Sequence, residues 1–187
     1  MAEQPDDELV RRFVADGDRA AFAELVERHQ RRVFNIAYRM LGQREDAADA
    51  VQDVFLRCLR KLGAFRGQAA FTTWLHRVTV NVCYDRLRRR REHLSLDEHM
   101  PDSPVSDHTD EMDAAADVHR ALQQVRQEFR IVVVLHDLQG QPYEAIAEAL
   151  GAPIGTVKSR LHRGRVALAR ILRGERSGAA VPSNEEP

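Results

Sequence analysis

Cations and aromatic rings recur at helical spacing in two segments of this 187-residue chain, and these residue types can contact nucleic acid. In the first segment, side chains three or four residues apart share one helical face: Trp74, Arg77, Asn81, Tyr84 and Arg88. Rings stack on unpaired bases at about 1–3 kcal/mol per base, while cations follow the phosphate backbone. The segment therefore predicts contact with single-stranded nucleic acid. The alternative, that Trp74 simply belongs to the core, fits the pattern equally well.

The second segment, residues 143–172, predicts a helix-turn-helix. Its first helix turns Ile146 and Leu150 inward, Gly151 supplies the turn, and Pro153 suits the start of the second helix. The expected inward positions of the second helix are Ile154, Val157, Leu161 and Leu168. Its outward positions are Thr156, Lys158, Ser159, His162, Arg163 and Arg165. This outward set can donate to phosphates and base edges in a major groove, so we favour DNA binding over a merely solvated cationic face.

Patterns typical of catalytic and metal sites do not occur in the sequence. There is no HExxH, Walker loop, GxSxG or closely spaced Cys/His set, and the eight histidines are scattered. Cys58 and Cys83 lie inside apolar helical patterns, which is typical of buried unpaired cysteines. We therefore expect no enzymatic activity, no metal and no cofactor.

The elements that position these residues are predicted to be helices throughout the N-terminal half. Asp6 and Asp7 can cap a short helix at residues 8–15, which Gly17 ends. The following helices are a run from Phe22 to Met40 closed by Gly42, one over residues 44–62 and, after a loop at 63–70, one over residues 71–91. These four helices can pack as a small bundle.

The predicted helix at residues 44–62 separates apolar from polar side chains. Its expected inward face consists of Ala47, Val51, Val54, Phe55, Cys58, Leu59 and Leu62. Its outer face carries Asp46, Asp49, Gln52, Asp53 and Arg57. The first half of that outer face is therefore acidic.

The expected fold class is all-α, with two small helical domains joined by a flexible acidic linker. Helices over about residues 112–125 and 127–138 precede the helix-turn-helix. The net charge is −1, yet residues 96–117 contain no Lys or Arg and eight Asp or Glu. We place the domains at residues 1–95 and 112–174, the linker at 96–111, and a disordered tail at 175–187.

Three segments carry a resemblance to a known family: EDAADAVQDVFLRCLRKLGAFRG, FTTWLHRVTVNVCYDRLRRRR and YEAIAEALGAPIGTVKSRLHRGR. In this order, with an acidic linker, they resemble the extracytoplasmic function (ECF) sigma factors, the smallest class of the bacterial sigma-70 family. The resemblance covers about residues 6–174. Two departures are Arg126, where the family usually has Pro, and Gly164, which replaces a common Ala at a helix-propensity cost of up to ~1 kcal/mol.

The resemblance implies a role for each domain and for particular residues. The first domain would be region 2, which binds core RNA polymerase and captures and melts the minus-ten element, and the second would be region 4, which reads the minus-thirty-five element. The polymerase contact is implied at Asp49, Gln52, Asp53, Leu56 and Arg57. Minus-ten capture is implied at Phe65, Arg66, Trp74, Arg77, Asn81, Tyr84 and Arg88. Minus-thirty-five contact is implied at Tyr143, Glu144, Thr156, Lys158, Ser159, His162 and Arg163.

The expected function is that of an alternative sigma factor for transcription initiation, without catalysis of its own. Its implied partners are core RNA polymerase (clamp and flap regions), promoter DNA and an anti-sigma protein. We expect a cytoplasmic location, because no apolar run approaches ~20 residues and the N-terminus lacks signal-peptide features. The alternatives are a stand-alone helix-turn-helix regulator, and an adaptor that engages only proteins, which would leave Lys158 and Arg163 without a role.

Overall fold

The structure is a computed structural model that describes residues 4–65, 67, 69–96 and 113–174. Within these ranges the regular elements are all helical, so the all-α prediction is confirmed. The predicted tail, the predicted linker beyond its first residue, and Arg66 lie outside the described residues.

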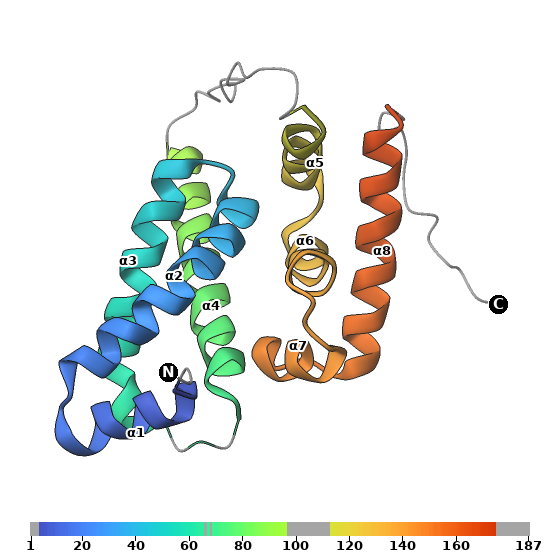
Figure 1. Cartoon of the computed structure of the whole chain (residues 1–187). Coiled ribbons are helices and arrows are strands. Elements are labelled where there is room, and N and C mark those ends of the chain that lie inside the picture. Colours follow the sequence, from blue (N-terminus) through green and yellow to red (C-terminus); the bar gives the residue numbers. More distant parts are fainter. Residues whose placement is uncertain (1–3, 66, 68, 97–112, 175–187) are drawn as a thin grey trace.

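The N-terminal half is a bundle of four helices (Figure 1). Its elements are α1 (Asp6–Asp16), α2 (Arg19–Leu41), α3 (Arg44–Lys61), the 3-10 turn η1 (Leu62–Ala64) and α4 (Phe71–Leu96). Gly17 and Gly42 adopt left-handed conformations with φ of 65° and 90°, and they end α1 and α2 as predicted. The helix predicted to end at Arg91 continues for five more residues.

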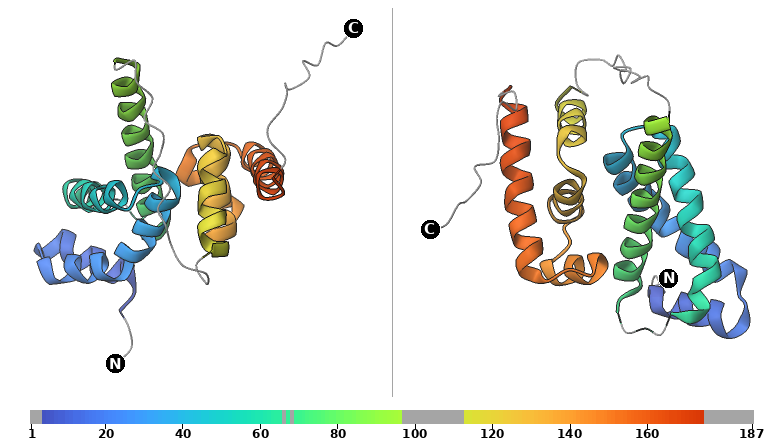
Figure 2. Two further views of the ribbon diagram at one scale, coloured as in Figure 1. Left: turned by 90° about the horizontal axis from the view of Figure 1, so that it is seen from above. Right: turned by 180° about the vertical axis from the view of Figure 1, so that it is seen from behind.

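The C-terminal half contains the remaining helices. They are α5 (Asp113–Gln124), α6 (Gln127–Val133) with the π-helical turn η2 (Val134–Leu138), α7 (Tyr143–Leu150) and α8 (Ile154–Leu172). Gly151 has a φ of 60° and ends α7, so the predicted helix, turn and helix are all present. Figures 1 and 2 show that α5–α8 lie beside the N-terminal bundle, with α7 against α4.

The predicted capping role of Asp6 and Asp7 is wrong. Asp6 is already helical, and the N-cap position falls on Pro5, whose side chain makes no capping hydrogen bond. The Asp6 carboxylate instead lies 2.7 Å from His29 Nε2, so it ties α1 to α2. A capping aspartate does occur one helix later, because Asp18 Oδ1 accepts hydrogen bonds from the first turn of α2.

Two residues predicted to face inward are exposed. Leu59 in α3 is 46% exposed, although Phe55, one turn earlier on the same side, is only 8% exposed. Cys58 and Leu62 beside it are fully buried, so Leu59 lies at the edge of the inward face, next to exposed Leu56. Ile154 is 40% exposed because it is the first residue of α8, before the buried Val157 and Leu161.

Gly164 allows α8 to approach α6 closely. A Cβ placed on Gly164 would lie 2.6 Å from Val133 Cγ2 and 3.1 Å from Phe129 O. The sequence pattern showed only the helix-propensity cost of this glycine. The packing shows what offsets that cost, since a side chain would force the two helices apart.

Candidate nucleic-acid and partner-binding surfaces

The outer face of α8 presents several polar side chains to solvent. Lys158, Ser159, His162 and Arg163 are exposed, while Thr156 is half-buried. Val157 and Leu161 are buried on the opposite side, which fixes the rotation of the helix. The predicted minus-thirty-five residues of α8 therefore lie together on one face.

Tyr143, the first residue of α7, lies beside this face. Its ring centroid is 5.5 Å from Lys158 Nζ and 4.7 Å from the His136 ring. A cation over an aromatic face is attracted by the ring quadrupole. Tyr143 therefore orients Lys158, and exposed Glu144 follows it in the same first turn of α7.

Arg165 is exposed as predicted, but its guanidinium group is already bound. Its Nε donates to Asp137 Oδ2 at 2.9 Å, and Nη2 donates to Asp137 Oδ1. The hydrogen bond from Arg165 lowers the pKa of Asp137 below its ordinary value. The pair ties α8 to η2, and the sequence pattern missed Asp137 because it lies 28 positions from Arg165.

The outer face of α3 combines ion pairs with exposed leucines. Arg86 of α4 donates to Asp53 Oδ2 at 2.6 and 3.0 Å, and Arg57 donates to Asp85 Oδ2 at 2.9 Å. Arg86 Nη1 also lies 3.7 Å from Asp49 Oδ2. Three of the five predicted polymerase-binding residues thus form ion pairs between α3 and α4. Asp49 and Gln52 are exposed, and Leu56 is 50% exposed. Leu59, which the pattern placed inside, extends this face.

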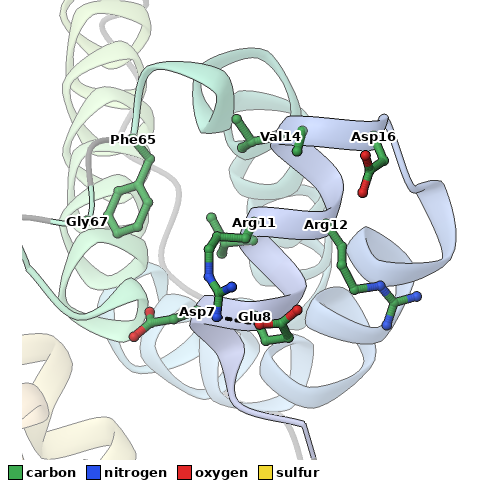
Figure 3. A pocket seen from close by; sticks show the side chains of 10 residues that line it. Asp7, Glu8, Arg11, Arg12, Val14, Asp16, Phe65 and Gly67 are labelled. Atoms are coloured by element: carbon green, nitrogen blue, oxygen red, sulfur yellow. Dashed lines mark ion pairs between the residues drawn. The ribbon is translucent and has the colours of Figure 1, made fainter.

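Phe65 belongs to an aromatic cluster at the start of α4. Its ring centroid is 5.4 Å from that of Trp74 and 6.3 Å from that of Phe71. Trp74 is half-buried and packs against the core, so it is partly the core residue that the alternative interpretation required. A cavity of about 670 Å³ lies between Phe65 and α1, and Figure 3 shows Phe65 across from Asp7 and Arg11.

The five residues predicted to share a face of α4 are not equally accessible. Arg77, Asn81 and Arg88 are exposed, whereas Trp74 and Tyr84 are half-buried. Burial raises the pKa of Tyr84. Among charged residues of the C-terminal half, Arg160 lowers this pKa and Glu128 raises it. Only part of the predicted stacking surface is therefore open. Arg66, predicted for the same surface, lies outside the described residues.

Both cysteines are buried, and burial raises the pKa of each thiol to about 12. Among the described residues, no group of three or more His, Cys, Asp or Glu side chains is placed to hold a metal ion. None of the described helices combines the length and apolar character that a membrane span requires.

The fold and these surfaces define a two-unit helical protein with a helix-turn-helix of the DNA-binding kind. Two family models match the chain, "Sigma-70 region 2" over residues 25–93 and "Sigma-70, region 4" over residues 115–168. The chain belongs to the sigma-70 family, and its relatives place it among the ECF sigma factors.

The comparisons give similar proteins that span both units. The chain is 44% identical to the ECF RNA polymerase sigma factor SigM of Mycobacterium tuberculosis H37Rv over 171 residues, 91% of this chain and 86% of that protein. It is 31% identical to the ECF RNA polymerase sigma factor SigW of Bacillus subtilis 168, covering 86% of this chain and 93% of that protein.

Two solved structures are also similar. One is the sigma factor RpoE of Bartonella quintana in complex with the anti-sigma factor NepR, with 24% identity, a TM-score of 0.72, and coverage of 83% of this chain and 98% of that one. The other is CnrH in complex with the cytosolic domain of CnrY, with 27% identity, a TM-score of 0.67, and coverage of 91% and 99%.

Membership of the family identifies the chain as an alternative sigma factor that directs RNA polymerase. Sigma factors specify promoters and do not catalyse, so the chain is a specificity subunit without enzymatic activity. Both regions match in order, which favours this function over a stand-alone helix-turn-helix regulator.

Proposed function

We propose that the chain binds core RNA polymerase through α3, captures the minus-ten element with the loop after η1 and with α4, and reads the minus-thirty-five element with α7 and α8. The observation that carries this proposal is the cationic face of α8, exposed within a matched region 4. Region 2 would occupy residues 1–95 and region 4 residues 112–174, joined by a linker at 96–111 and followed by a tail at 175–187. The family matches at 25–93 and 115–168 support these bounds.

For the minus-thirty-five element, α8 would enter the major groove as the second helix of a helix-turn-helix. Lys158, Ser159, His162 and Arg163 would reach base edges and phosphates, while Thr156 with Tyr143 and Glu144 would lie near the backbone. Arg163 is exposed and has no ion-pair partner among the described residues, so its guanidinium group is available to a guanine edge. A bidentate contact of this kind discriminates by about 1–3 kcal/mol.

For the minus-ten element, the cavity beside Phe65 offers room for an extruded base. A nucleobase held there would have the Phe65 ring on one side and α1 on the other (Figure 3). Exposed Arg77, Asn81 and Arg88 would follow the strand along α4, with Arg66 as a further cation and the rings of Trp74 and Tyr84 at their partly exposed edges. Contacts made only after strand separation stabilise the open complex.

For polymerase, the exposed leucines of α3 would form the centre of the interface. Leu56 and Leu59 are the large apolar side chains that this helix leaves open, with Asp49 and Gln52 beside them. Apolar anchors surrounded by polar groups are typical of the energetic centres of interfaces. Asp53 and Arg57 would then act at the rim, and region 4 would contact the flap.

We further propose a cytoplasmic location, where polymerase and promoters are found, and regulation by an anti-sigma protein. The complex of the similar CnrH with the cytosolic domain of CnrY supports regulation by a protein partner. A partner of this kind would cover surfaces needed by polymerase or DNA.

The deciding experiment is transcription in vitro by core RNA polymerase, with and without the protein, on a pool of bacterial promoter fragments. We expect protein-dependent transcripts from defined start sites that share elements near minus ten and minus thirty-five. Tight binding of duplex DNA by the protein alone, with neither core binding nor transcripts, would instead establish a stand-alone regulator.

The role of the loop is tested by Phe65→Ala. The variant should bind core polymerase normally yet open promoters more slowly, because a stacking surface is lost. Permanganate footprinting of promoter thymines measures the opening, and Arg60→Ala, an exposed change on α3, serves as a control for the assay. Normal thymine reactivity in the Phe65 variant would contradict base capture at this site.

A further inference from the structure

A carboxylate lies beside the cationic face of α8 and binds one of its arginines. Asp137 is on η2, the π-helical turn that continues α6, and α6 packs along α8 (Figure 1). Arg165 Nε donates to Asp137 Oδ2 at 2.9 Å, and Arg165 Nη2 donates to Oδ1 of the same carboxylate. One guanidinium group thus uses both carboxylate oxygens, which is the bidentate geometry of a strong ion pair.

His136 supports this carboxylate from within η2. His136 Nδ1 lies 2.9 Å from Asp137 Oδ1 and must carry the proton, because an ionised carboxylate only accepts. The hydrogen bonds from Arg165 and His136 both lower the pKa of Asp137, and Asp137 in turn raises the pKa of Arg165. Both members of the pair are therefore charged at neutral pH. The Asp137 side chain is 27% exposed and that of Arg165 is 52% exposed.

Arg165 shares its side of α8 with two of the proposed DNA contacts. Lys158, His162 and Arg165 follow one another at steps of four and three residues, so they form one row along the helix. Lys158 and His162 are both exposed. The position of Arg165 on α8 therefore suits a contact with a phosphate, whereas its pairing with Asp137 opposes such a contact.

The two cations of this row are held in different ways. Lys158 Nζ lies 5.5 Å from the ring centroid of Tyr143, and the Tyr143 ring lies 4.7 Å from that of His136. A cation over an aromatic ring keeps its charge for an incoming phosphate, whereas a cation bound by a carboxylate is neutralised. The side chains of η2 and α7 thus orient Lys158 and neutralise Arg165.

We propose that Asp137 is a specificity-determining residue, which withholds Arg165 from DNA phosphates. The inference deepens the proposed function and rests on it, because it concerns the face of α8 assigned to the minus-thirty-five element. Phosphate contacts carry no sequence information and strengthen binding to any duplex. A sigma factor must select promoters in the presence of a large excess of other sequences. An element that removes a sequence-independent contact therefore improves this selection.

The proposal predicts a change in the salt dependence of DNA binding. Asp137→Asn keeps the shape of the side chain but removes its charge, so Arg165 becomes available to a phosphate. Each neutralised phosphate steepens the plot of log K against log salt by about 0.9. For a duplex without promoter elements, the variant should show this increase in slope and bind roughly five- to tenfold more tightly at about 0.1 M salt.

Binding to a minus-thirty-five fragment should gain less from the same substitution. Base contacts by Arg163 and its neighbours would fix α8 in a single register on that fragment. On other sequences, α8 can settle wherever the released guanidinium group meets a phosphate. The ratio of specific to non-specific affinity should therefore fall in the Asp137→Asn variant.

The test titrates labelled duplexes, with and without a minus-thirty-five element, with the full chain at roughly 50 to 200 mM salt and follows fluorescence anisotropy. Asp117→Asn is the matched control, since it removes the same charge from α5, where Asp117 pairs with Arg120 instead of a residue of α8. It should leave the slope unchanged. Asp137→Glu, which keeps the charge, should preserve the slope of the wild type.

A double variant separates the release of Arg165 from other effects of losing Asp137. Asp137→Asn combined with Arg165→Ala should return the slope and the non-specific affinity to about the values of the wild type. A purely structural role of Asp137 predicts a different result, namely weaker binding of Asp137→Asn to both duplexes at an unchanged slope. That result, or a steeper slope that persists in the double variant, would overturn the proposal. Circular dichroism confirms that each variant is folded.

The outcomes also separate this inference from the proposed function. In transcription by the reconstituted holoenzyme, unlabelled non-specific duplex should inhibit the Asp137→Asn protein at a lower concentration than the wild type. A steeper slope in a protein that supports no transcription with core polymerase would refute the sigma function and leave the role of Asp137 in DNA binding standing. Normal transcription with an unchanged slope would refute the role of Asp137 alone.

Discussion

Region 2 and region 4 use their surface charges differently. On α3 and α4, cations and carboxylates pair with each other, as in Arg86 with Asp53 and Arg57 with Asp85. On α8, Lys158 and Arg163 are exposed, and neither has an ion-pair partner among the described residues. Charges that are paired across helices stabilise packing, whereas unpaired ones are available for a polyanion. A count of charges along the sequence would treat both groups alike.

The largest expected effect concerns the apolar centre of the α3 surface. Leu56→Asp combined with Leu59→Asp should weaken binding to core polymerase by at least 30-fold, about 2 kcal/mol or more, because two apolar side chains are replaced by charges. Both leucines are about half exposed, so the fold should persist. Fluorescence anisotropy with labelled protein measures the affinity.

The control for this pair is Val14→Asp on α1, which replaces another exposed apolar side chain, 44% accessible. It should leave core binding unchanged. An equal loss in the control would mean that the exposed leucines of α3 have no special role in binding polymerase.

The next effect compares two arginines on the same helix. Arg163→Ala should cost about 1–3 kcal/mol of binding to a minus-thirty-five fragment if it reads a base edge. Arg165→Ala should cost less, because its guanidinium group is held by Asp137. Titrations at several salt concentrations measure both changes, and a larger loss for Arg165 would reverse the distinction between paired and unpaired cations.

The comparison extends to the interiors, where region 2 buries His76 and region 4 buries Arg130. Burial, with repulsion from Arg32 and His29, lowers the pKa of His76 from 6.5 to about 4. The folded state therefore binds fewer protons than the unfolded state, so stability is complete above pH 6.5 and is lost as the pH falls toward 4. At pH 5 the loss should be about 2 kcal/mol.

His76→Phe, which keeps a ring in the core, should abolish this pH dependence. Urea unfolding at pH 7 and pH 5, followed by the fluorescence of the single tryptophan, Trp74, reports on region 2. Burial lowers the pKa of Arg130 only to about 10, so Arg130 should contribute no pH dependence in this range. An unchanged acid sensitivity in the variant would assign it to another group.

The smallest effect concerns the paired charges themselves. Arg86→Ala should lower the free energy of unfolding by about 0.5–1 kcal/mol, because its bonds to Asp53 are partly exposed to solvent. Arg163→Ala should leave that free energy unchanged. Thermal unfolding of the two variants measures the difference, and an equal effect would show that the pairs across α3 and α4 contribute nothing to packing.

The sequence predicted the presence of the helices and several of their ends, because glycine signals and periodicity are local. Gly17, Gly42 and Gly151 end helices where the pattern placed their ends, since left-handed backbone favours glycine wherever the chain requires it. Periodicity was less reliable at the edges of faces. Leu59 follows the apolar pattern of α3 but is exposed at the edge of the inward face, although Cys58 and Leu62 beside it are fully buried.

In the candidate surfaces, too, local features could be predicted from the sequence and contacts between distant residues could not. The residues of α8 could be placed on one outer face from spacing alone, and the structure brings them together there. The pairing of Arg165 with Asp137, and the packing of α7 against α4, could not be predicted, because these partners are far apart in the chain. Spacing within a helix gives the direction of a side chain but not what meets it.

The sequence by itself determined the helical class, the turns at Gly17, Gly42 and Gly151, and the two motifs of the sigma-70 family, because local backbone preference and helical periodicity depend on consecutive residues. Only the tertiary structure decided which charges are paired and why Gly164 is needed between α6 and α8. It also decided that Arg130 of α6 caps the C-terminal end of α2, where its Nη1 donates to Met40 O at 2.7 Å. The physical reason is that the capping contact is made to backbone carbonyls. Every residue carries such a carbonyl, so no side-chain pattern marks the ones that a distant arginine will reach.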